Sequence, residues 1–368
     1  MQSDSLFEKY KEEAIQLLKQ RDFHSEIAWQ SPSNIALVKY WGKHGNQLPN
    51  NPSVSLSLSV SRTETRVKAQ RKTTETPGFQ FLFEGKESPA FGQKVQTFIK
   101  SIIPAFPFLT ELDLVIESKN TFPHSSGIAS SASSMSALVM CLLEIERQIT
   151  SAEIDLQKAS FFSRLGSGSA ARSVFPHAAE WGFSENIKGS SDEFAISLSD
   201  NLHPIFKTYR DSILIIHSGT KSVSSRAGHA LMENNPFAEV RYQEARNNTV
   251  LIMNALQNGD LEKFIDVTES EALQLHALMM TSNPSYILMQ PGSLAAISAI
   301  RNFRKQSSVP LCFTLDAGPN IHLLYPEEYR ESVSDLIHNE LLPLCHNNEW
   351  IDDCVGTGAS KLNNFEPE

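Results

Sequence analysis

Residues 112–149 read LDLVIESKNTFPHSSGIASSASSMSALVMCLLEIERQI, and this stretch indicates the fold more clearly than any other. The apolar pattern predicts a strand over 112–117 and a helix over 132–149. Between them, a loop rich in serine and glycine at 123–131 runs directly into the helix. Backbone N–H groups at the positive end of a helix can bind phosphate, although a serine-rich connection that only caps the helix is the alternative. The loop is not a Walker A loop, because the sequence contains no G-x-x-x-x-G-K-[ST].

The rest of the chain alternates clusters of strands with helices. Apolar side chains alternate with serines over 54–61, which predicts a half-buried strand, and residues 62–70 are expected to be its partner. Further strands are expected at 26–40, 212–216, 311–315, 321–325 and 350–355, and further helices at 152–165, 236–258, 260–278, 293–305 and 328–340. Strands in antiparallel clusters with helices between them indicate an α+β fold.

The length of 368 residues favours two domains over one. A short amphipathic helix is expected at the amino terminus, where Ser5 and Glu8 form a capping box. We therefore divide the chain into a helical extension (1–24), an N-terminal domain (25–204) and a C-terminal domain (205–368).

Composition narrows the class of function. The formal net charge of −10 argues against nucleic acid as a partner, since that affinity needs clustered lysines and arginines. The four cysteines include no CxxC pair and are expected to be reduced core residues. Neither a signal peptide nor a run of about 20 apolar residues is present, so we expect a cytoplasmic protein that does not associate with membranes.

Three further segments carry groups suited to an anionic substrate. Residues 31–43 place Lys39, Tyr40 and Lys43 at the end of an apolar strand, where they can contact an anion. Arg172 follows a turn of small residues, and its planar fork suits a carboxylate or a phosphate. Asp316 ends an apolar strand at a Gly-Pro turn. Taken singly, solvated lysines, an exposed arginine and an ordinary turn aspartate are the alternatives.

In this order and spacing, the segments resemble the diphosphomevalonate decarboxylases of the GHMP kinase superfamily. The resemblance runs from about Glu26 to beyond Asp316. Its strongest pieces are Asn34-Ile35-Ala36, Lys39-Tyr40-Trp41-Gly42-Lys43, Gly127-Ile128-Ala129-Ser130-Ser131, Gly166-Ser167-Gly168-Ser169 with Arg172-Ser173, Glu180-Trp181, Lys221-Ser222-Val223-Ser224-Ser225-Arg226 and Asp316-Ala317-Gly318-Pro319-Asn320. It implies a two-domain α+β fold with antiparallel and mixed sheets and an active site in the cleft between the domains.

The resemblance also implies roles for individual residues. The catalytic positions would be Asp316, which faces a tertiary hydroxyl, Lys39 beside it, and Arg172 and Asn34 near the substrate carboxylate. The diphosphate would be bound by Tyr40, Trp41, Gly42, Lys43, Lys94, Ser167, Gly168, Ser169, Ala170, Ala171, Arg172, Ser225 and Arg226. The phosphates of ATP would be bound by Pro123, Ser125, Ser126, Gly127, Ala129, Ser130, Ser131 and Ser134, with Mg²⁺ at Ser131.

The implied activity is ATP-dependent decarboxylation of mevalonate diphosphate to isopentenyl diphosphate by a homodimer. The loop departs from the family pattern at His124-Ser125-Ser126, where Thr-Ala-Ala is usual, but no charge assigned to chemistry is missing. Three alternatives stay open: a small-molecule kinase of the same superfamily, a decarboxylase that uses 5-phosphomevalonate, and a metabolite-binding protein without catalysis.

Overall fold

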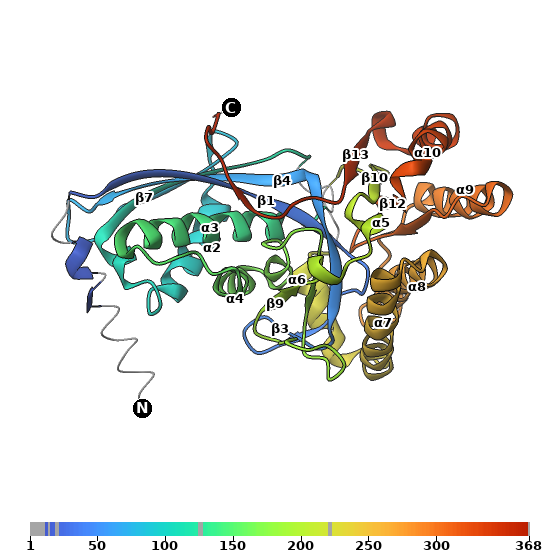
Figure 1. The fold of residues 1–368 in the computed structure, drawn as a ribbon, viewed down its shortest axis with the longest axis horizontal. Coiled ribbons are helices and arrows are strands. Elements are labelled where there is room, and N and C mark those ends of the chain that lie inside the picture. The colour runs from blue at the N-terminus through green and yellow to red at the C-terminus, as the bar shows by residue number, and fades with distance from the viewer. Residues whose placement is uncertain (1–11, 14, 19–21, 124–127, 220–222, 367–368) are drawn as a thin grey trace.

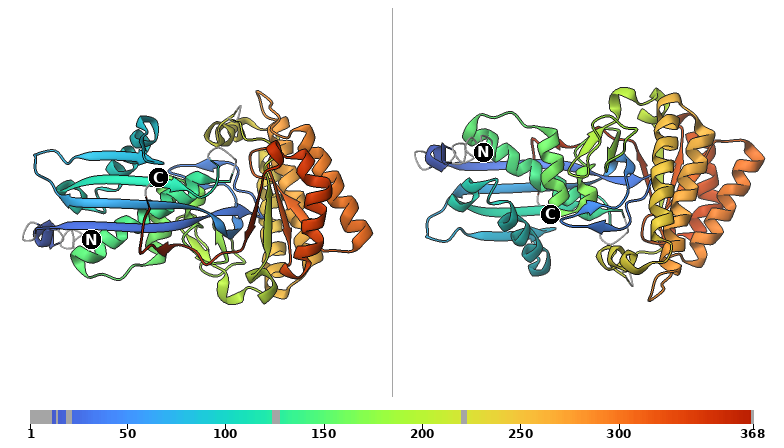
Figure 2. Two further views of the ribbon diagram at one scale, coloured as in Figure 1. Left: turned by 90° about the horizontal axis from the view of Figure 1, so that it is seen from above. Right: turned by 90° about the horizontal axis from the view of Figure 1, so that it is seen from below.

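Two β-sheets with their helices form the two halves of the molecule (Figure 1). The computed structural model describes residues 12–13, 15–18, 22–123, 128–219 and 223–366. The long sheet of the first half and the helix stack of the second half lie end to end in both views of Figure 2. This arrangement confirms the expected α+β class.

The first half is built on one large sheet. Its strands are β1 (His24–Ala36), β4 (Ser53–Arg71), β5 (Phe79–Phe83), β6 (Lys86–Glu87), β7 (Leu112–Asn120), β8 (Ala178–Trp181), β9 (Ala195–Ser197) and β14 (Ser360–Lys361). Their order is β14-β1-β4-β7-β5-β6, while β8 pairs with β4 and β9. The pairing of β5 with β7 is parallel and the others are antiparallel, so the sheet is mixed. A separate hairpin, β2 (Lys43–His44) and β3 (Leu48–Pro49), follows β1.

Helices α2 (Pro89–Ile102), α3 (Ser130–Thr150) and α4 (Leu156–Gly166) cover one face of this sheet (Figure 1). Their apolar side chains share a core with those of β1, β4 and β7. The carboxyl-terminal segment returns to the first half, where Phe365 lies 4.8 Å from the guanidinium of Arg66. The last strand, β14, therefore joins the first sheet although it follows the second sheet in sequence.

The second half is a four-stranded antiparallel sheet between two helical layers. Its strands are β10 (Arg210–Leu214), β11 (Cys312–Thr314), β12 (Ile321–Tyr325) and β13 (Trp350–Cys354), in the order β11-β12-β10-β13. Helices α7 (Ala238–Asn258) and α8 (Leu261–Met280) pack on one face, and α9 (Pro291–Ser307) and α10 (Arg330–Leu336) pack on the other. The short helices α5 (Pro204–Lys207) and α6 (Ser225–Ala230) precede α7.

Single turns complete the secondary structure. The 3₁₀ turns are η1 (Pro107–Glu111), η2 (Gly168–Ala171), η3 (Ser199–Asn201), η4 (Leu231–Asn234), η5 (Glu327–Tyr329), η7 (Leu342–Leu344) and η8 (His346–Asn348), and η6 (Ile337–Leu341) is a π turn.

The two sheets meet at β4. Leu58 forms an isolated bridge with Val355, just after β13. The buried carboxylate of Asp353 accepts hydrogen bonds from the N–H groups of Ser59 (3.0 Å), Val60 (2.7 Å) and Ser61 (2.7 Å). A charged acceptor thus satisfies three main-chain donors of β4 where the two sheets join.

Two expectations about this region were wrong. Residues 62–70 are not the partner of 54–61 but the second part of the 19-residue strand β4, and they pair with β1 and β7. Nor is the first part half-buried along its whole length, because Ser53, Ser55 and Ser57 are fully buried as well as the apolar residues between them, and exposure begins only at Ser59 and Val60. The serine face is covered by polar groups of the site described below, which alternation alone does not show.

The ends of some elements also differ from expectation. Helix α4 begins at Leu156 rather than at 152, because Asp155 caps it by accepting a hydrogen bond from the N–H of Gln157. Ser5 and Glu8, the expected amino-terminal capping box, lie outside the described residues. The expected helices at 236–258, 260–278 and 293–305 are confirmed as α7, α8 and α9. In the described part of the chain, no helix is both long enough and apolar enough to cross a membrane.

Candidate active site

A buried ion pair joins the two halves of the molecule. Lys39 follows β1, and its Nζ donates to Oδ1 of Asp316, which follows β11, over 2.9 Å. The lysine side chain is 2% exposed and that of the aspartate 28%, so the pair is accessible from its carboxylate side. Burial lowers the pKa of Lys39, and the nearby carboxylates of Asp316 and Glu271 oppose that shift. The ammonium therefore depends on its carboxylate partners to remain charged.

Beside this pair, a buried arginine from the turn after η2 meets two polar residues of the first sheet. Arg172 donates to Ser53 Oγ and to Asn34 Oδ1, the latter over 3.2 Å. Asn34 in turn donates to Ser173 Oγ over 2.8 Å, which fixes its amide orientation. Burial lowers the pKa of Arg172 to about 10, while the charge of Asp316 acts in the opposite direction. The guanidinium therefore keeps its charge at neutral pH, close to the Lys39–Asp316 pair.

A second group of cations has no described counter-ion. The Lys43 ammonium, in β2, donates to Gln47 Oε1 over 2.8 Å, and Arg226 lies at the start of α6. Within the described residues, neither cation is paired with a carboxylate. Burial and the charge of Arg226 both lower the pKa of Lys43. Two neighbouring cations without a carboxylate favour an anionic ligand between them.

Aromatic packing holds these segments together. The ring of His229, in α6, lies 4.4 Å from Tyr40 and 4.6 Å from Trp41 by their centroids. Its Nδ1 accepts from the N–H of Gly42 over 3.0 Å, so the proton of the neutral ring is on Nε2. Burial lowers the pKa of His229 to about 3, so the ring is neutral at physiological pH.

Glycines allow the close approach of these segments. Gly42 has φ +95°, and a Cβ there would lie 2.2 Å from the Tyr242 hydroxyl oxygen. A Cβ on Gly168 would lie 2.7 Å from the Tyr40 hydroxyl oxygen. The small-residue turn of η2 therefore packs directly against the segment that carries Lys39 and Lys43.

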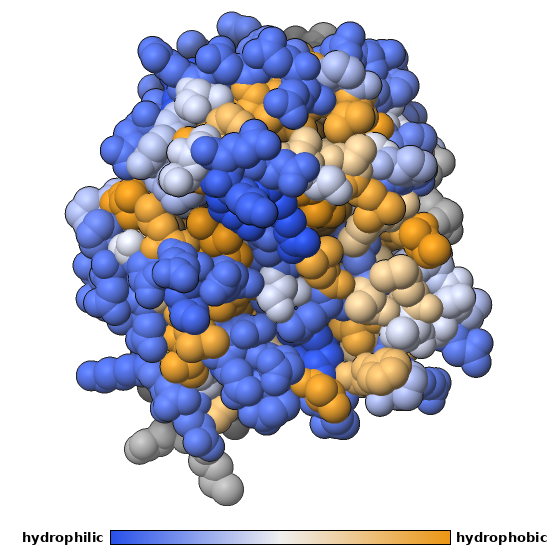
Figure 3. All heavy atoms as spheres, turned by 90° about the vertical axis from the view of Figure 1, so that its right-hand side faces the viewer, coloured by the Kyte–Doolittle hydropathy of each residue, from blue (hydrophilic) through white to orange (hydrophobic). Residues whose placement is uncertain are grey.

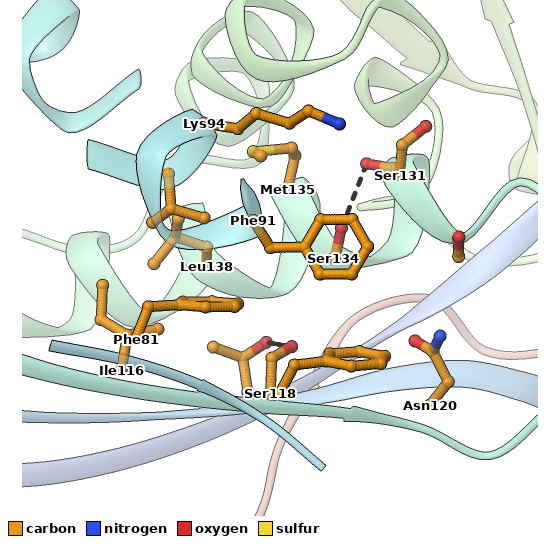
Figure 4. A pocket seen from close by; sticks show the side chains of 14 residues that line it. Phe81, Phe91, Lys94, Ile116, Ser118, Asn120, Ser131, Ser134, Met135 and Leu138 are labelled. Carbon is orange, nitrogen blue, oxygen red and sulfur yellow. Dashed lines mark hydrogen bonds between the residues drawn. The ribbon is translucent and has the colours of Figure 1, made fainter. Parts of the chain in front are cut away.

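A separate pocket lies beside the amino terminus of α3 (Figure 4). It is a cavity of about 130 Å³, lined by Thr65, Phe81, Phe83, Phe91, Lys94, Val95, Ile116, Ser118, Asn120, Ser130, Ser131, Ser134, Met135 and Leu138. Apolar and aromatic side chains line much of the pocket, and Ser130, Ser131 and Ser134 line it at the start of α3. This mixture of lining groups suits a small-molecule ligand with one apolar and one charged part.

The start of α3 has the geometry of an anion site. The Ncap residue, Ala129, has φ +41°, and no side chain among the described residues caps the helix. Ser131 Oγ lies 3.3 Å from Ser167 Oγ, so this terminus is close to the turn that leads to Arg172. The first N–H groups of α3 are thus available to a phosphate.

The structure places most of the expected site residues near one another. Lys39, Tyr40, Trp41, Gly42, Asn34, Arg172, Asp316 and the turn Ser167, Gly168 and Ser169 are linked by the contacts above, and Ala170 and Ala171 are fully buried behind that turn. Ser225 and Arg226 are exposed at the start of α6. Lys94 lies on the wall of the α3 pocket. Ser125, Ser126 and Gly127 lie outside the described residues, and Pro123 is exposed just before them.

Sequence reasoning missed several residues of the site. Ser53 binds Arg172, and Glu271 binds the main chain of Lys39 over 2.9 Å. Glu180, which the sequence marked as part of the resemblance but without a role, is fully buried with neither carboxylate oxygen hydrogen-bonded to a described residue, and burial raises its pKa well above the usual range. The serine alternation of 53–61 was the signal for Ser53, whereas Glu271 and His229 lie in ordinary helical patterns.

Comparison with known proteins identifies the family. A family model of diphosphomevalonate decarboxylase-like N-terminal domains matches residues 31–195, and one of mevalonate 5-diphosphate decarboxylase C-terminal domains matches residues 212–363. The diphosphomevalonate decarboxylase of Gibberella zeae is 31% identical over 313 residues, which are 81% of this chain and 80% of that protein. The chain belongs to the diphosphomevalonate decarboxylase family.

Other members of the family extend the comparison. The mevalonate diphosphate decarboxylase of Staphylococcus aureus has a TM-score of 0.80 and 28% identity, over 93% of this chain and 99% of that one. The structure of MDDEF in complex with MVAPP, AMPPCP and magnesium has a TM-score of 0.78 and 27% identity, over 93% of this chain and all of that one. A phosphomevalonate decarboxylase of Haloferax volcanii is 26% identical over 82% of this chain and 88% of that protein.

Proposed function

We propose that the protein catalyses the ATP-dependent decarboxylation of (R)-5-diphosphomevalonate to isopentenyl diphosphate, ADP, phosphate and CO₂. The observation that carries the proposal is the buried Lys39–Asp316 pair beside Arg172, in a member of the diphosphomevalonate decarboxylase family. A carboxylate next to two buried cations suits a substrate with both a hydroxyl and a carboxylate near its reacting carbon.

In this proposal, Asp316 orients the tertiary hydroxyl and accepts its proton, while Lys39 stabilises the ionised carboxylate. ATP supplies the phosphoryl group that makes this hydroxyl a good leaving group. Positive character then develops on the carbon that the group leaves. The neighbouring carboxylate departs as CO₂, and the electron pair of the broken carbon–carbon bond forms the double bond of the product. The buried surroundings of Lys39 exclude water from that carbon.

Arg172 and Asn34 bind the substrate carboxylate in the same proposal, since their polar groups meet beside the ion pair. Lys43 and Arg226 bind the diphosphate, because they are neighbouring cations without a described counter-ion. Tyr40, Trp41 and Gly42, Ser225 and the turn Ser167–Ala171 shape that end of the site. In this assignment, the residues that bind the diphosphate equally in the ground state and the transition state differ from those that take part in the reaction.

The pocket beside α3 is proposed to bind ATP. Its aromatic end suits the base, and the terminus of α3, which no described side chain caps, suits the phosphates. Lys94 lies on this wall, so we now assign it to the nucleotide rather than to the diphosphate. No cluster of three or more histidine, cysteine or acidic side chains among the described residues could hold a metal. Mg²⁺, which often binds through phosphates and few protein groups, would then bind with the nucleotide near Ser131.

The experiment that tests this function is a substrate panel. CO₂ release is measured with ATP and, in turn, mevalonate, its 5-phosphate and its 5-diphosphate. We expect release with the diphosphate at a kcat/KM at least about tenfold above that with the monophosphate, because Lys43 and Arg226 offer charge to a second phosphate. A preference for the monophosphate would instead place the chain with decarboxylases such as that of Haloferax volcanii.

We further propose that the protein is a cytoplasmic homodimer that binds neither nucleic acid nor membranes. Apolar side chains are interspersed with hydrophilic ones on the end of the molecule formed by the second half (Figure 3). Exposed examples in the second half are Ile287, Leu294 and Met280. Sedimentation equilibrium would test the dimer, and cell fractionation would test the location. A single monomeric species at micromolar concentration would exclude the dimer.

A further inference from the structure

The main chain of Lys39 is held by a buried ion pair from the other half of the molecule. Glu271 Oε2, on α8, accepts from the Lys39 N–H over 2.9 Å, and Arg241, on α7, donates to the Lys39 carbonyl oxygen over 3.3 Å. The two side chains also bind each other through both guanidinium nitrogens, over 2.9 and 2.6 Å. The exposed fraction is 2% for the arginine and zero for the glutamate.

These contacts replace hydrogen bonds that a sheet would otherwise supply. Strand β1 ends at Ala36, so the buried N–H and C=O of Lys39 lie beyond its ladder and need other partners. The carboxylate of Glu271 also accepts from Asn248 Nδ2 over 2.7 Å, which brings its donors to four. A carboxylate bound in this way by charged and neutral donors has a fixed position.

The same helix also holds the other member of the Lys39–Asp316 pair. His276, on α8, donates from Nε2 to the main-chain oxygen of Asp316 over 3.2 Å. Lys39 belongs to the first half of the chain and Asp316 to the second, so their separation depends on how the halves are held. Because α8 binds the main chain of both, one rigid element sets that separation.

We propose that Arg241 and Glu271 are positioning residues that hold Lys39 in register with Asp316 through helix α8. This inference rests on the proposed function, because register matters only if the two side chains act together. A misplacement of about 1 Å at such a pair can cost roughly 100-fold in rate. The pair affects the reacting groups rather than the anion contacts, so its loss acts on kcat and not on KM.

The test compares Glu271→Gln with Glu269→Gln on the same helix. Glu269 is also buried and also binds arginines, Arg301 over 3.1 Å and Arg304 over 2.5 Å, but it contacts α9 and not the site. We expect Glu271→Gln to lower kcat by at least about 30-fold, with both KM values within about threefold of wild type. Glu269→Gln should lower the melting temperature and leave kcat within about twofold of wild type.

Amide hydrogen exchange gives a readout that does not depend on catalysis. Peptides spanning 37–43 should exchange faster in Glu271→Gln than in wild type, because the amide leaves one acceptor oxygen for the four donors that Glu271 binds, and the Lys39 N–H must compete for it. The same peptides should not change in Glu269→Gln. If the wild-type chain released no CO₂, the proposed function would fail, while the exchange measurement would still decide whether the pair holds Lys39.

A second variant covers the case in which Glu271→Gln does not fold. Arg241→Lys keeps the positive charge but loses the planar fork, so it should fold, lower kcat about tenfold and speed exchange over 37–43 to a smaller extent. Wild-type kcat and wild-type exchange in a folded Glu271→Gln or, failing that, in Arg241→Lys would overturn the inference. An equal loss of kcat in Glu269→Gln would do so as well.

Discussion

The cations of the site are of two kinds, those with a carboxylate counter-ion and those without one. Lys39 has a carboxylate partner at 2.9 Å, whereas Lys43 and Arg226 have none among the described residues. A cation that is already paired serves to tune its partner, and a cation without a partner serves to bind an anion. The difference between these residues gives distinct expectations for their substitution.

Asp316→Asn tests the reacting end. The amide cannot accept the hydroxyl proton and leaves the buried ammonium of Lys39 without its counter-ion. We expect kcat to fall by at least about 1,000-fold, while binding of the diphosphate substrate stays within about tenfold of wild type. Isothermal titration with the substrate and steady-state CO₂ release measure the two quantities. More than a tenth of wild-type activity would remove Asp316 from the chemistry.

Lys43→Ala and Arg226→Ala test the anion end. Each removes charge from the proposed diphosphate site without touching the reacting carbon, so KM should rise about 10- to 100-fold with a smaller change in kcat. Lys305→Ala, an exposed lysine of α9, is the control and should leave both constants unchanged. An effect of either site variant on kcat alone would transfer that residue to the catalytic group.

At the scale of elements, the strand and the helix within residues 112–149 show why local patterns succeed. Strand β7 and helix α3 both lie where the apolar spacing predicts them, because their apolar side chains pack in one core with those of the neighbouring elements. The alternation of serines in β4 wrongly predicted a half-buried strand, because it gives no sign of what covers the polar face. Its polar face is buried against Arg172 and against main-chain oxygens of Val38 and Phe175, contacts that come from distant parts of the chain.

The pocket beside α3 supports a prediction about α2. Lys94 of this helix lines the pocket, whereas Lys100, in its last turn, does not. We expect Lys94→Ala to raise KM for ATP about three- to tenfold and to leave KM for the diphosphate substrate unchanged, because the lost charge faces the nucleotide. Lys100→Ala should change neither constant. A rise confined to the substrate KM would return Lys94 to the diphosphate site.

At the scale of the whole molecule, Asp353 connects the two sheets. Loss of its carboxylate leaves the N–H groups of Ser59, Val60 and Ser61 without their acceptor at a buried junction. Since each unsatisfied buried group costs about 1–3 kcal/mol, Asp353→Ala should lower the free energy of unfolding by about 3 kcal/mol. Denaturant unfolding measures this against Asp335→Ala, an exposed residue of α10 whose change should stay within about 0.5 kcal/mol.

The site could be predicted only in part, because some of its residues are defined by contacts between distant parts of the chain. Lys39, Arg172 and Asp316 each stand in a short segment whose small or apolar neighbours mark it in the sequence. Glu271 and Arg241 lie on α8 and α7, about 230 and 200 residues after Lys39, where glutamate and arginine are ordinary helix residues. Their importance comes only from the main-chain atoms that they bind, and no local pattern records such contacts.

The most direct test of the account is the stoichiometry of a single turnover. Enzyme in excess is mixed with diphosphomevalonate labelled in its carboxylate and with ATP labelled at the γ-phosphate, and CO₂, ADP and phosphate are followed by rapid quench. The proposed mechanism yields one ADP and one phosphate for each CO₂, and no CO₂ when a β,γ-methylene analogue replaces ATP. Release of CO₂ without ATP, or formation of ADP with a stable phosphorylated product and no CO₂, would contradict it.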